Sequence, residues 1–320
     1  MAKSPRNKTI DTATEDGLEY LNRCIIWGDM EPETRCNLRV ETLKDKVING
    51  DTFCVMEDIA GAGAVGFADL MVADPPYNLS KDYDGRSFSS MSDGEYERYT
   101  RRWIEKSLPL LAGNASVYVC CDWRSSVVMG RVLGDYFKVR NRITWQREKG
   151  RGARENWKNS MEDIWFATLG DEYNFNVDRI KVRRQVLAPY RDRGRPKDWS
   201  ETAEGRFRDT HPSNFWDDIT VPFWSMAENT AHPAQKPEKL VAKLILASSN
   251  PGDLVFDPFG GSGTTAVVAR KLGRHFLTAE IHDRYCIWAQ QRLEMAESDC
   301  RIQGYEDGVF WERNTEKKLK

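Results

Sequence analysis

Three short motifs in the chain combine residue types that can bind a planar amino group and a nucleoside. The first is Asp74-Pro75-Pro76-Tyr77, which follows the apolar run 68–73 (ADLMVA). Two prolines stiffen the end of a predicted strand, so the Asp74 carboxylate and the Pro75 carbonyl oxygen are held as acceptors for N–H groups. The Tyr77 ring can stack on a flat substrate. The competing interpretation is a proline turn that carries a surface tyrosine.

The second motif is the glycine-rich loop 257–265 (DPFGGSGTT), between a predicted strand and a predicted helix. Its glycines permit tight turning and close approach of the backbone to a ligand. The loop matches neither a Walker phosphate loop nor the GxGxxG pattern. Glu280 ends the next predicted strand, where a carboxylate can bind the diol of a ribose. Loop and acid together indicate a cofactor that carries a nucleoside.

The third motif is the segment 232–237 (HPAQKP), directly before a predicted helix. The positive end of a helix dipole favours a carboxylate ligand, and His232, Gln235 and Lys236 add polar side chains there. A capped loop with a hydrogen-bonded histidine is the competing interpretation. The motif in isolation does not decide between the two.

The elements that must position these motifs alternate along the chain, as is typical of an α/β protein. Apolar runs bounded by turn residues predict strands, and apolar residues at helical spacing predict the helices between them. This alternation favours a doubly wound, mostly parallel, Rossmann-like sheet, in which ligands bind at the carboxyl ends of the strands. The predicted strands are 68–73, 116–121, 142–145, 163–168, 253–257 and 275–280; the predicted helices are 93–111, 125–136, 236–249, 264–272 and 284–297, with a helical stretch at 18–25.

The composition excludes several classes of protein. Of the 320 residues, 40% are hydrophobic and 30% charged, as in a soluble globular protein. No apolar run approaches the roughly 20 residues of a membrane helix, and the N-terminus lacks a signal-peptide core. The seven cysteines form no CxxC pair, and with the four histidines they show no zinc spacing. These counts predict a cytoplasmic protein with free thiols and without a metal site.

The charge distribution is more informative than the net charge. A net charge of −2, taken alone, argues against a nucleic-acid partner. The segment 179–197, however, carries eight basic residues and one acid, and aromatic residues follow it between 199 and 224. Basic side chains mixed with aromatic ones suit phosphate contact and base stacking. A solvated surface loop is the competing interpretation of this segment.

The three motifs, in this order, resemble those of the β-class amino-methyltransferases, which act on exocyclic amines of DNA bases. The resemblance spans 47–293 and includes 74–81 (DPPYNLSK), 173–176 (YNFN) and 247–257 (ASSNPGDLVFD). It implies an enzyme that transfers a methyl group from S-adenosylmethionine to adenine N6, because adenine enzymes of that family usually have Asp where Asp74 stands. Cytosine-N4 enzymes usually have Ser there, and cytosine-N4 methylation is the alternative. Cytosine-C5 chemistry is disfavoured, since no cysteine follows a proline.

The resemblance also implies roles for individual residues. A target adenine would be flipped out of the duplex and methylated directly on its amino nitrogen, without a covalent enzyme intermediate. The residues expected to be catalytic are Asp74, Pro75, Pro76 and Tyr77. Those expected to bind S-adenosylmethionine are Asp51, Thr52, Asp74, His232, Ala234, Gln235, Lys236, Phe259, Gly261, Ser262, Gly263, Thr264 and Glu280. Those expected to bind DNA are Arg183, Arg184, Arg191, Arg193, Arg195 and Lys197.

We expect five segments along the chain. They are an N-terminal extension (1–45), a catalytic subdomain (46–145), a target-recognition region (146–230), a cofactor-binding subdomain (231–300) and a C-terminal tail (301–320). Double-stranded DNA is the expected partner, while a cognate restriction endonuclease and a homodimer stay open. Two further hypotheses compete with this one: a DNA-recognition protein that binds the cofactor without catalysis, and a methyltransferase that acts on RNA or protein.

Overall fold

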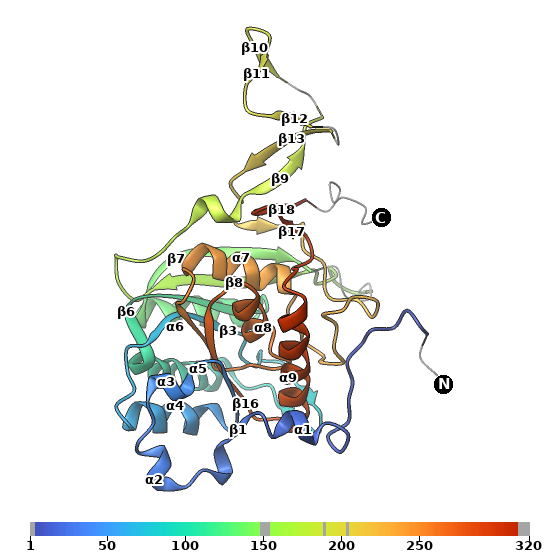
Figure 1. The fold of residues 1–320 in the computed structure, drawn as a ribbon. Helices are drawn as coiled ribbons and strands as arrows, with labels where there is room; N and C mark the ends of the chain where they lie inside the picture. The colour runs from blue at the N-terminus through green and yellow to red at the C-terminus, as the bar shows by residue number, and fades with distance from the viewer. Residues whose placement is uncertain (1–3, 148–153, 188–189, 203–204, 313–320) are drawn as a thin grey trace.

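A nine-stranded sheet forms the centre of the computed structural model, which describes residues 4–147, 154–187, 190–202 and 205–312 (Figure 1). The strand β8 runs antiparallel to both of its neighbours, and the other neighbouring pairs are parallel. In order across the sheet the strands are β1 (Ile25–Ile26), β2 (Lys46–Asn49), β16 (His275–Glu280), β15 (Leu254–Asp257), β3 (Ala68–Ala73), β6 (Leu111–Cys121), β8 (Met161–Thr168), β7 (Lys138–Gln146) and β14 (Phe215–Trp216).

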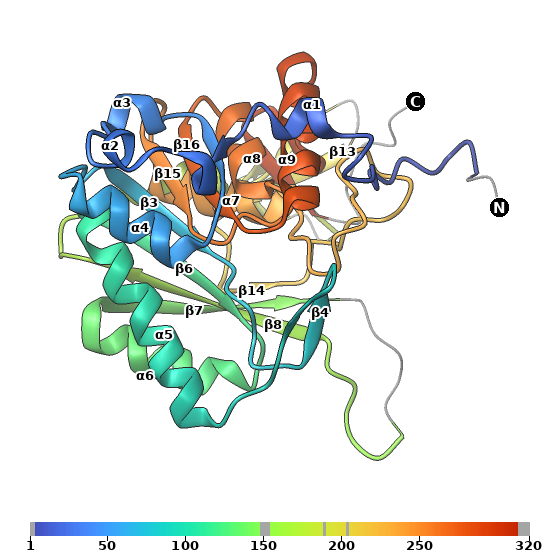
Figure 2. The same ribbon diagram turned by 90° about the horizontal axis from the view of Figure 1, so that it is seen from below.

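Helices cover both faces of this sheet, which confirms the predicted doubly wound fold (Figure 2). Alternate residues of β3 enter different cores: Leu70 and Val72 pack on one face, and Met71 and Ala73 on the other. A strand buried on both faces is apolar throughout, which is why 68–73 could be recognised in the sequence. The helices are α4 (Thr52–Gly61), α5 (Asp93–Ser107) and α6 (Ser125–Tyr136) on one face, and α7 (Glu238–Ser248), α8 (Thr264–Lys271) and α9 (Asp283–Ser298) on the other.

One predicted boundary is wrong. Helix α5 ends at Ser107 rather than at residue 111, and β6 begins at Leu111 rather than at residue 116. Between them lies a 3₁₀ turn, Leu108–Leu110, with Pro109 near its start. Proline has no N–H and cannot continue an α-helix interior, so the chain turns there. The start of α5 is fixed by a capping box in which Ser92 and Glu95 satisfy each other's backbone N–H groups.

Two neighbouring strands, β3 and β15, mark the point at which the winding of the sheet reverses. From β3 the chain continues to β6 on one side, and from β15 it continues to β16 on the other. In open α/β sheets, ligands bind in the crevice beyond the carboxyl ends of such strands. The first motif directly follows β3 and the glycine-rich loop directly follows β15, so the topology brings both motifs to one edge of the sheet.

A smaller sheet projects from the body and carries the basic segment (Figure 1). We call residues 182–210 of this projection the arm. Its hairpin of β10 (Arg191–Asp192) and β11 (Arg195–Pro196) lies beyond a five-stranded sheet. In order, that sheet contains β12 (Ser200–Thr202), β13 (Gly205–Thr210), β9 (Val182–Gln185), β18 (Val309–Trp311) and β17 (Tyr305–Glu306).

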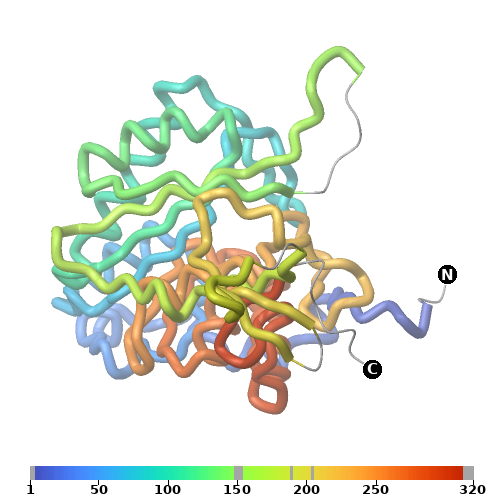
Figure 3. Tube along the Cα trace, turned by 90° about the horizontal axis from the view of Figure 1, so that it is seen from above, coloured from blue at the N-terminus to red at the C-terminus, as the bar shows by residue number. Residues whose placement is uncertain are grey.

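The expected C-terminal tail is therefore a structural part of the arm as far as the described residues reach. Strand β18 pairs in parallel with β9, with Phe310 opposite Val182, and the two segments lie side by side in Figures 1 and 3. Phe310 is fully buried, and Trp311 packs edge-on against Phe207 of β13. Burial of these rings explains why residues that were expected to form a tail fold back onto the arm.

The expected N-terminal extension likewise joins the body. Its strand β1 pairs with β2, and Ile10 bridges to Thr230. Short helices α1 (Leu18–Leu21), α2 (Pro32–Arg35) and α3 (Val40–Leu43) complete this region, and a hairpin of β4 (Lys81–Tyr83) and β5 (Arg86–Phe88) follows the first motif. Within the ranges that the structure describes, no helix has the length and apolarity needed to cross a membrane.

The packing of α8 against α9 predicts a large cost for a side chain at Gly263. Gly263 has φ +76°, and a Cβ there would lie 2.6 Å from Ala289 Cβ; Gly273 has φ +72° with open space around it. Both Gly→Ala substitutions incur left-handed strain of about 1–2 kcal/mol. Gly263→Ala should lose about 1–3 kcal/mol more through overpacking. Urea denaturation of both variants measures the difference, and equal losses would contradict this packing argument.

Candidate active site

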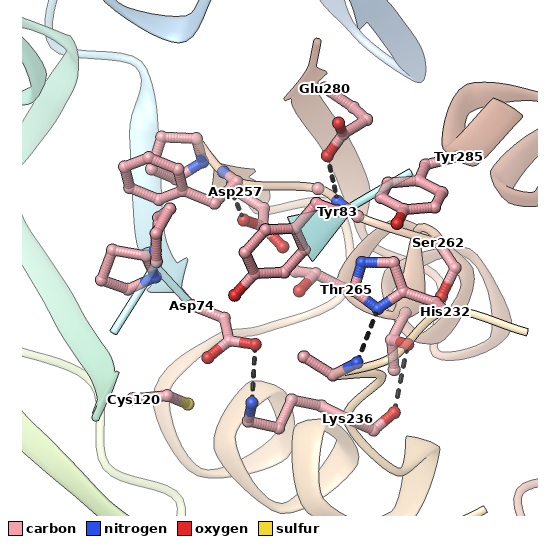
Figure 4. Close-up of a pocket in the computed structure, with 18 of the residues that line it drawn as sticks. Asp74, Tyr83, Cys120, His232, Lys236, Asp257, Ser262, Thr265, Glu280 and Tyr285 are labelled. Carbon is pink, nitrogen blue, oxygen red and sulfur yellow. Dashed lines mark hydrogen bonds and ion pairs between the residues drawn. The ribbon is translucent and has the colours of Figure 1, made fainter. Parts of the chain in front are cut away.

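A cavity of about 300 Å³ lies at the carboxyl ends of β3 and β15, and all three motifs contribute to its wall (Figure 4). The sequence-predicted residues that line it are Asp51, Thr52, Asp74, Pro75, Pro76, Tyr77, His232, Ala234, Gln235, Lys236, Phe259, Gly261, Ser262, Thr264 and Glu280. Gly263 is not among them, because it caps α8 and packs against Ala289. The fold thus collects nearly all of the residues expected to be catalytic or to bind the cofactor.

Asp74 lies between two donors at the floor of this cavity (Figure 4). Lys236 Nζ is 2.6 Å from Asp74 Oδ2, and the Tyr77 hydroxyl donates to Asp74 Oδ1 over 2.9 Å. The Lys236 ammonium also lies 5.2 Å from the centroid of the Tyr77 ring. The Tyr96 hydroxyl donates to the Pro76 carbonyl oxygen over 3.1 Å, which fixes the turn after β3. Lys236 therefore contacts the catalytic motif itself, a contact that the sequence did not indicate.

Two charged residues that the sequence analysis missed complete this cluster. Glu162 on β8 and Arg147 at the end of β7 both line the cavity and form an ion pair. Glu162 Oε2 accepts from the Tyr77 hydroxyl over 3.2 Å and lies 3.5 Å from Lys236 Nζ. Burial alone would raise the pKa of Glu162, but Lys236 and Arg147 outweigh it and lower that pKa. One signal was available, since an acid in an otherwise apolar strand is rarely buried without a partner.

Glu280 binds the backbone of the glycine-rich loop. Its carboxylate accepts the N–H groups of Gly261 and His282, each over 2.8 Å. Burial raises the pKa of Glu280 to about 7. Gly261 has φ +50°, and a Cβ there would lie only 3.2 Å from His232 Nε2. The absence of a side chain at Gly261 lets the loop, the acid and the third motif meet at one wall of the cavity.

The polar and apolar atoms of the cavity fit a cofactor such as S-adenosylmethionine. The hydroxyls of Thr52 and Ser262 are buried at its wall and have no hydrogen-bond partner within the described part of the chain. A buried polar group without a partner is costly, so polar atoms of a ligand would relieve that cost. Phe53 and Phe259 add aromatic surface to the cavity, and Glu280 adds an acceptor suited to a ribose diol.

The third motif folds into a turn that leads into α7. Burial lowers the pKa of His232 to about 3, so its ring is neutral, and Nδ1 accepts the N–H of Ala234 over 3.2 Å. The Gln235 side chain accepts from Thr230 N over 2.8 Å and donates to the Glu228 carbonyl oxygen over 2.6 Å. The amide group of Gln235 thus serves to shape the turn, in addition to lining the cavity.

The opposite wall is built by the start of α4. Asp51 caps this helix, and its Oδ1 accepts from Phe53 N over 2.9 Å and from Cys54 N over 3.2 Å. Asp51 lines the cavity together with Thr52 and Phe53. Capping leaves the second carboxylate oxygen of Asp51 available to a ligand, while it fixes the position of the side chain.

Part of the predicted DNA-binding set is balanced within the arm. Arg183 and Asp209, on neighbouring strands β9 and β13, form two hydrogen bonds of 2.8 Å. Arg184 lies 3.0 Å from Glu312. These two arginines therefore hold the arm together as well as contributing charge to it.

The remaining basic residues lie toward the outer end of the arm. The guanidinium of Arg191 lies 5.3 Å from the centroid of the Trp199 ring. Arg193 has φ +48° in the turn of the β10–β11 hairpin. Arg193, Arg195 and Lys197 are all exposed. The structure thus separates the predicted set into two paired arginines near the body and an exposed group at the hairpin.

Comparison with known proteins identifies the class of this chain. A family model described as DNA methylase, N6_N4_Mtase, matches residues 68–291. The type II methyltransferase M.HpaI of Haemophilus parainfluenzae is 32% identical over 231 residues, which are 71% of this chain and 68% of the relative. The DNA adenine methyltransferase YhdJ of Escherichia coli K12 is 31% identical over 257 residues, 78% of this chain and 83% of the relative.

Solved structures share the fold. The PvuII DNA methyltransferase, described as cytosine-N4-specific, matches with a TM-score of 0.55 and 17% identity over 80% of this chain and 92% of its own. The DNA modification methylase TTHA0409 of Thermus thermophilus, complexed with S-adenosyl-L-methionine, matches with a TM-score of 0.51 and 19% identity over 83% of this chain and 98% of its own. At this identity the likeness concerns the fold.

The buried Asp257 at the end of β15 predicts a specific dependence of stability on pH. Burial raises the pKa of Asp257 from 3.8 to about 7. The folded state thus holds a proton that the unfolded state releases between these values, so this stabilising contribution is present below pH 3.8 and is lost as the pH rises through 7.

In Asp257→Asn this dependence is removed. Relative to the variant, the unsubstituted chain should lose about 2–4 kcal/mol of unfolding free energy between about pH 4 and about pH 8. Urea denaturation across that range measures the difference. Parallel curves for the two proteins would contradict the prediction.

Proposed function

This chain belongs to the DNA methylase family, and we propose that it is a site-specific DNA adenine-N6 methyltransferase that uses S-adenosylmethionine. The observation that carries the proposal is the cavity at the switch point of the sheet. There the Asp74 carboxylate and the glycine-rich loop with Glu280 face the same space from neighbouring strands. One side suits a planar amino group and the other a nucleoside cofactor, so donor and acceptor would meet in a single pocket.

Specific residues would hold the cofactor. S-adenosylmethionine, when bound, supplies a methyl group on a positively charged sulfur. Glu280 would accept the ribose hydroxyls, and Thr52 and Ser262 offer buried hydroxyls to its polar atoms. Phe259, held edge-on against Trp103, would contact the flat part of the nucleoside. These roles, and those expected for the other residues of the wall, follow from the family resemblance and from their position at the cavity.

The chemistry that this chain performs itself is orientation of the base. An adenine amino group is inaccessible inside duplex DNA, so the base must leave the stack. Asp74 and the Pro75 carbonyl oxygen would accept its two N–H groups and turn the nitrogen lone pair out of conjugation with the ring. Tyr77, positioned by its hydroxyl contacts, would support the plane of the base. Holding the reactants in this geometry supplies much of the rate enhancement of such a transfer.

Cytosine-N4 methylation is the second candidate. The family model and the PvuII structure both keep it under consideration. Asp74 as the first residue of the catalytic motif and the name of the relative YhdJ, a DNA adenine methyltransferase, favour adenine. We therefore place adenine first.

The partners beyond DNA are part of the proposal. The relative M.HpaI is named a type II methyltransferase, which supports a restriction endonuclease with the same recognition site as a cognate partner. Action on DNA would place the protein in the cytoplasm of a bacterial cell. The homodimer stays a hypothesis, and the mass of the protein in solution would test it.

The product of the reaction tests the proposed function. The purified chain, S-adenosylmethionine with a labelled methyl group and unmethylated genomic DNA should yield labelled N6-methyladenine in a nucleoside digest. Asp74→Ala should lower kcat at least about 10²-fold, because a positioned acceptor is removed. Asp171→Ala, which removes an exposed carboxylate distant from the cavity, is the matched control. Label in N4-methylcytosine would establish the second candidate, and unlabelled DNA would refute both.

The exposed basic group of the arm makes a second prediction. Changing Arg193, Arg195 and Lys197 together to Gln should weaken DNA binding and reduce the slope of log K against log salt by about 0.9 for each phosphate that is no longer bound. Arg39, Lys46 and Arg98 are exposed basic residues outside the arm, and their triple Gln variant is the control. Fluorescence anisotropy at several salt concentrations gives the slopes. An unchanged slope in the arm variant would place the hairpin away from DNA.

A further inference from the structure

The Glu162 carboxylate lies where it can accept both of the donors that now occupy Asp74. The Tyr77 hydroxyl has one proton, yet it is 2.9 Å from Asp74 Oδ1 and 3.2 Å from Glu162 Oε2. Lys236 Nζ is 2.6 Å from Asp74 Oδ2 and 3.5 Å from Glu162 Oε2. Both donors thus stand between two carboxylates, and they favour Asp74 in this structure.

Burial makes this arrangement consequential. The side chain of Glu162 is 4% exposed and that of Lys236 is 9% exposed, so neither charge can be satisfied by bulk water. Arg147 forms an ion pair with Oε1 of Glu162, which leaves Oε2 as the oxygen directed at Tyr77 and Lys236. The cluster therefore holds one carboxylate that a positive charge already stabilises and one that is exposed to the cavity.

Asp74 has a second task in the proposed reaction. It must accept an N–H of the target amino group, but an ammonium at 2.6 Å competes for the same carboxylate and reduces its strength as an acceptor. The same competition applies to the Tyr77 hydroxyl at the other oxygen. Binding of the substrate thus requires another acceptor for these donors.

We propose that Glu162 is a positioning residue of the methyl-transfer site. It takes over the Lys236 ammonium and the hydrogen bond of the Tyr77 hydroxyl when the target amino group binds to Asp74. This role rests on the proposed function. Hydrogen bonds are exchanged within the cluster, while no covalent bond changes and the total charge stays constant. Arg147 keeps Glu162 in place during the exchange.

The neighbouring residue supplies a matched control. Asp163 is equally buried on β8, but its carboxylate accepts from Ser126 Oγ over 2.7 Å and from Thr144 Oγ1 over 2.8 Å. Successive side chains of a strand point to opposite faces, and Asp163 does not line the cavity. Loss of a buried carboxylate as such can therefore be separated from loss of the carboxylate that faces Lys236.

The test compares Glu162→Gln, Glu162→Asp and Asp163→Asn in methylation of DNA by the full chain. Glu162→Gln keeps the size of the side chain but removes the charge that would attract Lys236. We expect its kcat to fall about 10- to 100-fold, the scale of a misplaced reacting group, with the KM for DNA within about two-fold. Glu162→Asp keeps the charge at a shorter reach, so its kcat should be intermediate. Asp163→Asn should lose stability in urea but keep kcat within about three-fold.

Several outcomes would overturn this role. One is an unchanged kcat in Glu162→Gln, and another is a fall of kcat in Asp163→Asn equal to that in Glu162→Gln. If Glu162→Gln does not fold, Glu162→Asp decides, because full kcat with a carboxylate withdrawn by one methylene contradicts the need for contact with Lys236. Absence of methylation by the unsubstituted chain would instead refute the proposed function, and this role with it.

Discussion

The parallel pairing of β3 with β15 is the constraint on which the rest of the molecule depends. Parallel strands end at the same edge of a sheet, so two motifs far apart in the sequence reach one cavity without any long loop. Both strands are apolar because helices cover both faces of the sheet, and burial of that apolar surface stabilises the fold by about 25 cal/mol per Å². The hydrophobic core and the placement of the site are therefore consequences of the same pairing.

Burial of charge is the second theme of the structure. Lys236, Glu162 and Arg147 are drawn from three separate parts of the chain, and each would be costly to bury alone. A similar arrangement lies behind the glycine-rich loop, where Arg292 of α9 donates to the Ser262 carbonyl oxygen and forms an ion pair with Glu238 of α7. One network faces the cavity and the other holds the helices that carry the loop. Polar contacts thus fix the geometry that apolar packing leaves adjustable.

The sequence was most informative where structure is determined locally. The apolar run 68–73, the motif after it and the glycine-rich loop could be placed correctly because periodicity and turn residues act over a few positions. Contacts between distant segments could not be predicted. Nothing near Lys236 in the sequence indicates that it pairs with Asp74, and nothing near 305–311 indicates that these residues pair with β9. The boundary error at Pro109 has a simpler cause, since the signal was present and its effect on the helix end was underestimated.

The pairing of β18 with β9 means that the arm is assembled from two separate stretches of the chain, 182–210 and 305–311. The body of the protein lies between them in sequence and beneath them in space. If the arm determines which DNA site is chosen, that specificity is not encoded in a contiguous cassette. Recombination that exchanged only the central stretch between relatives would leave β9 beside a foreign β18. Heritable change of specificity in this architecture would then require coordinated substitutions at two distant places in the gene.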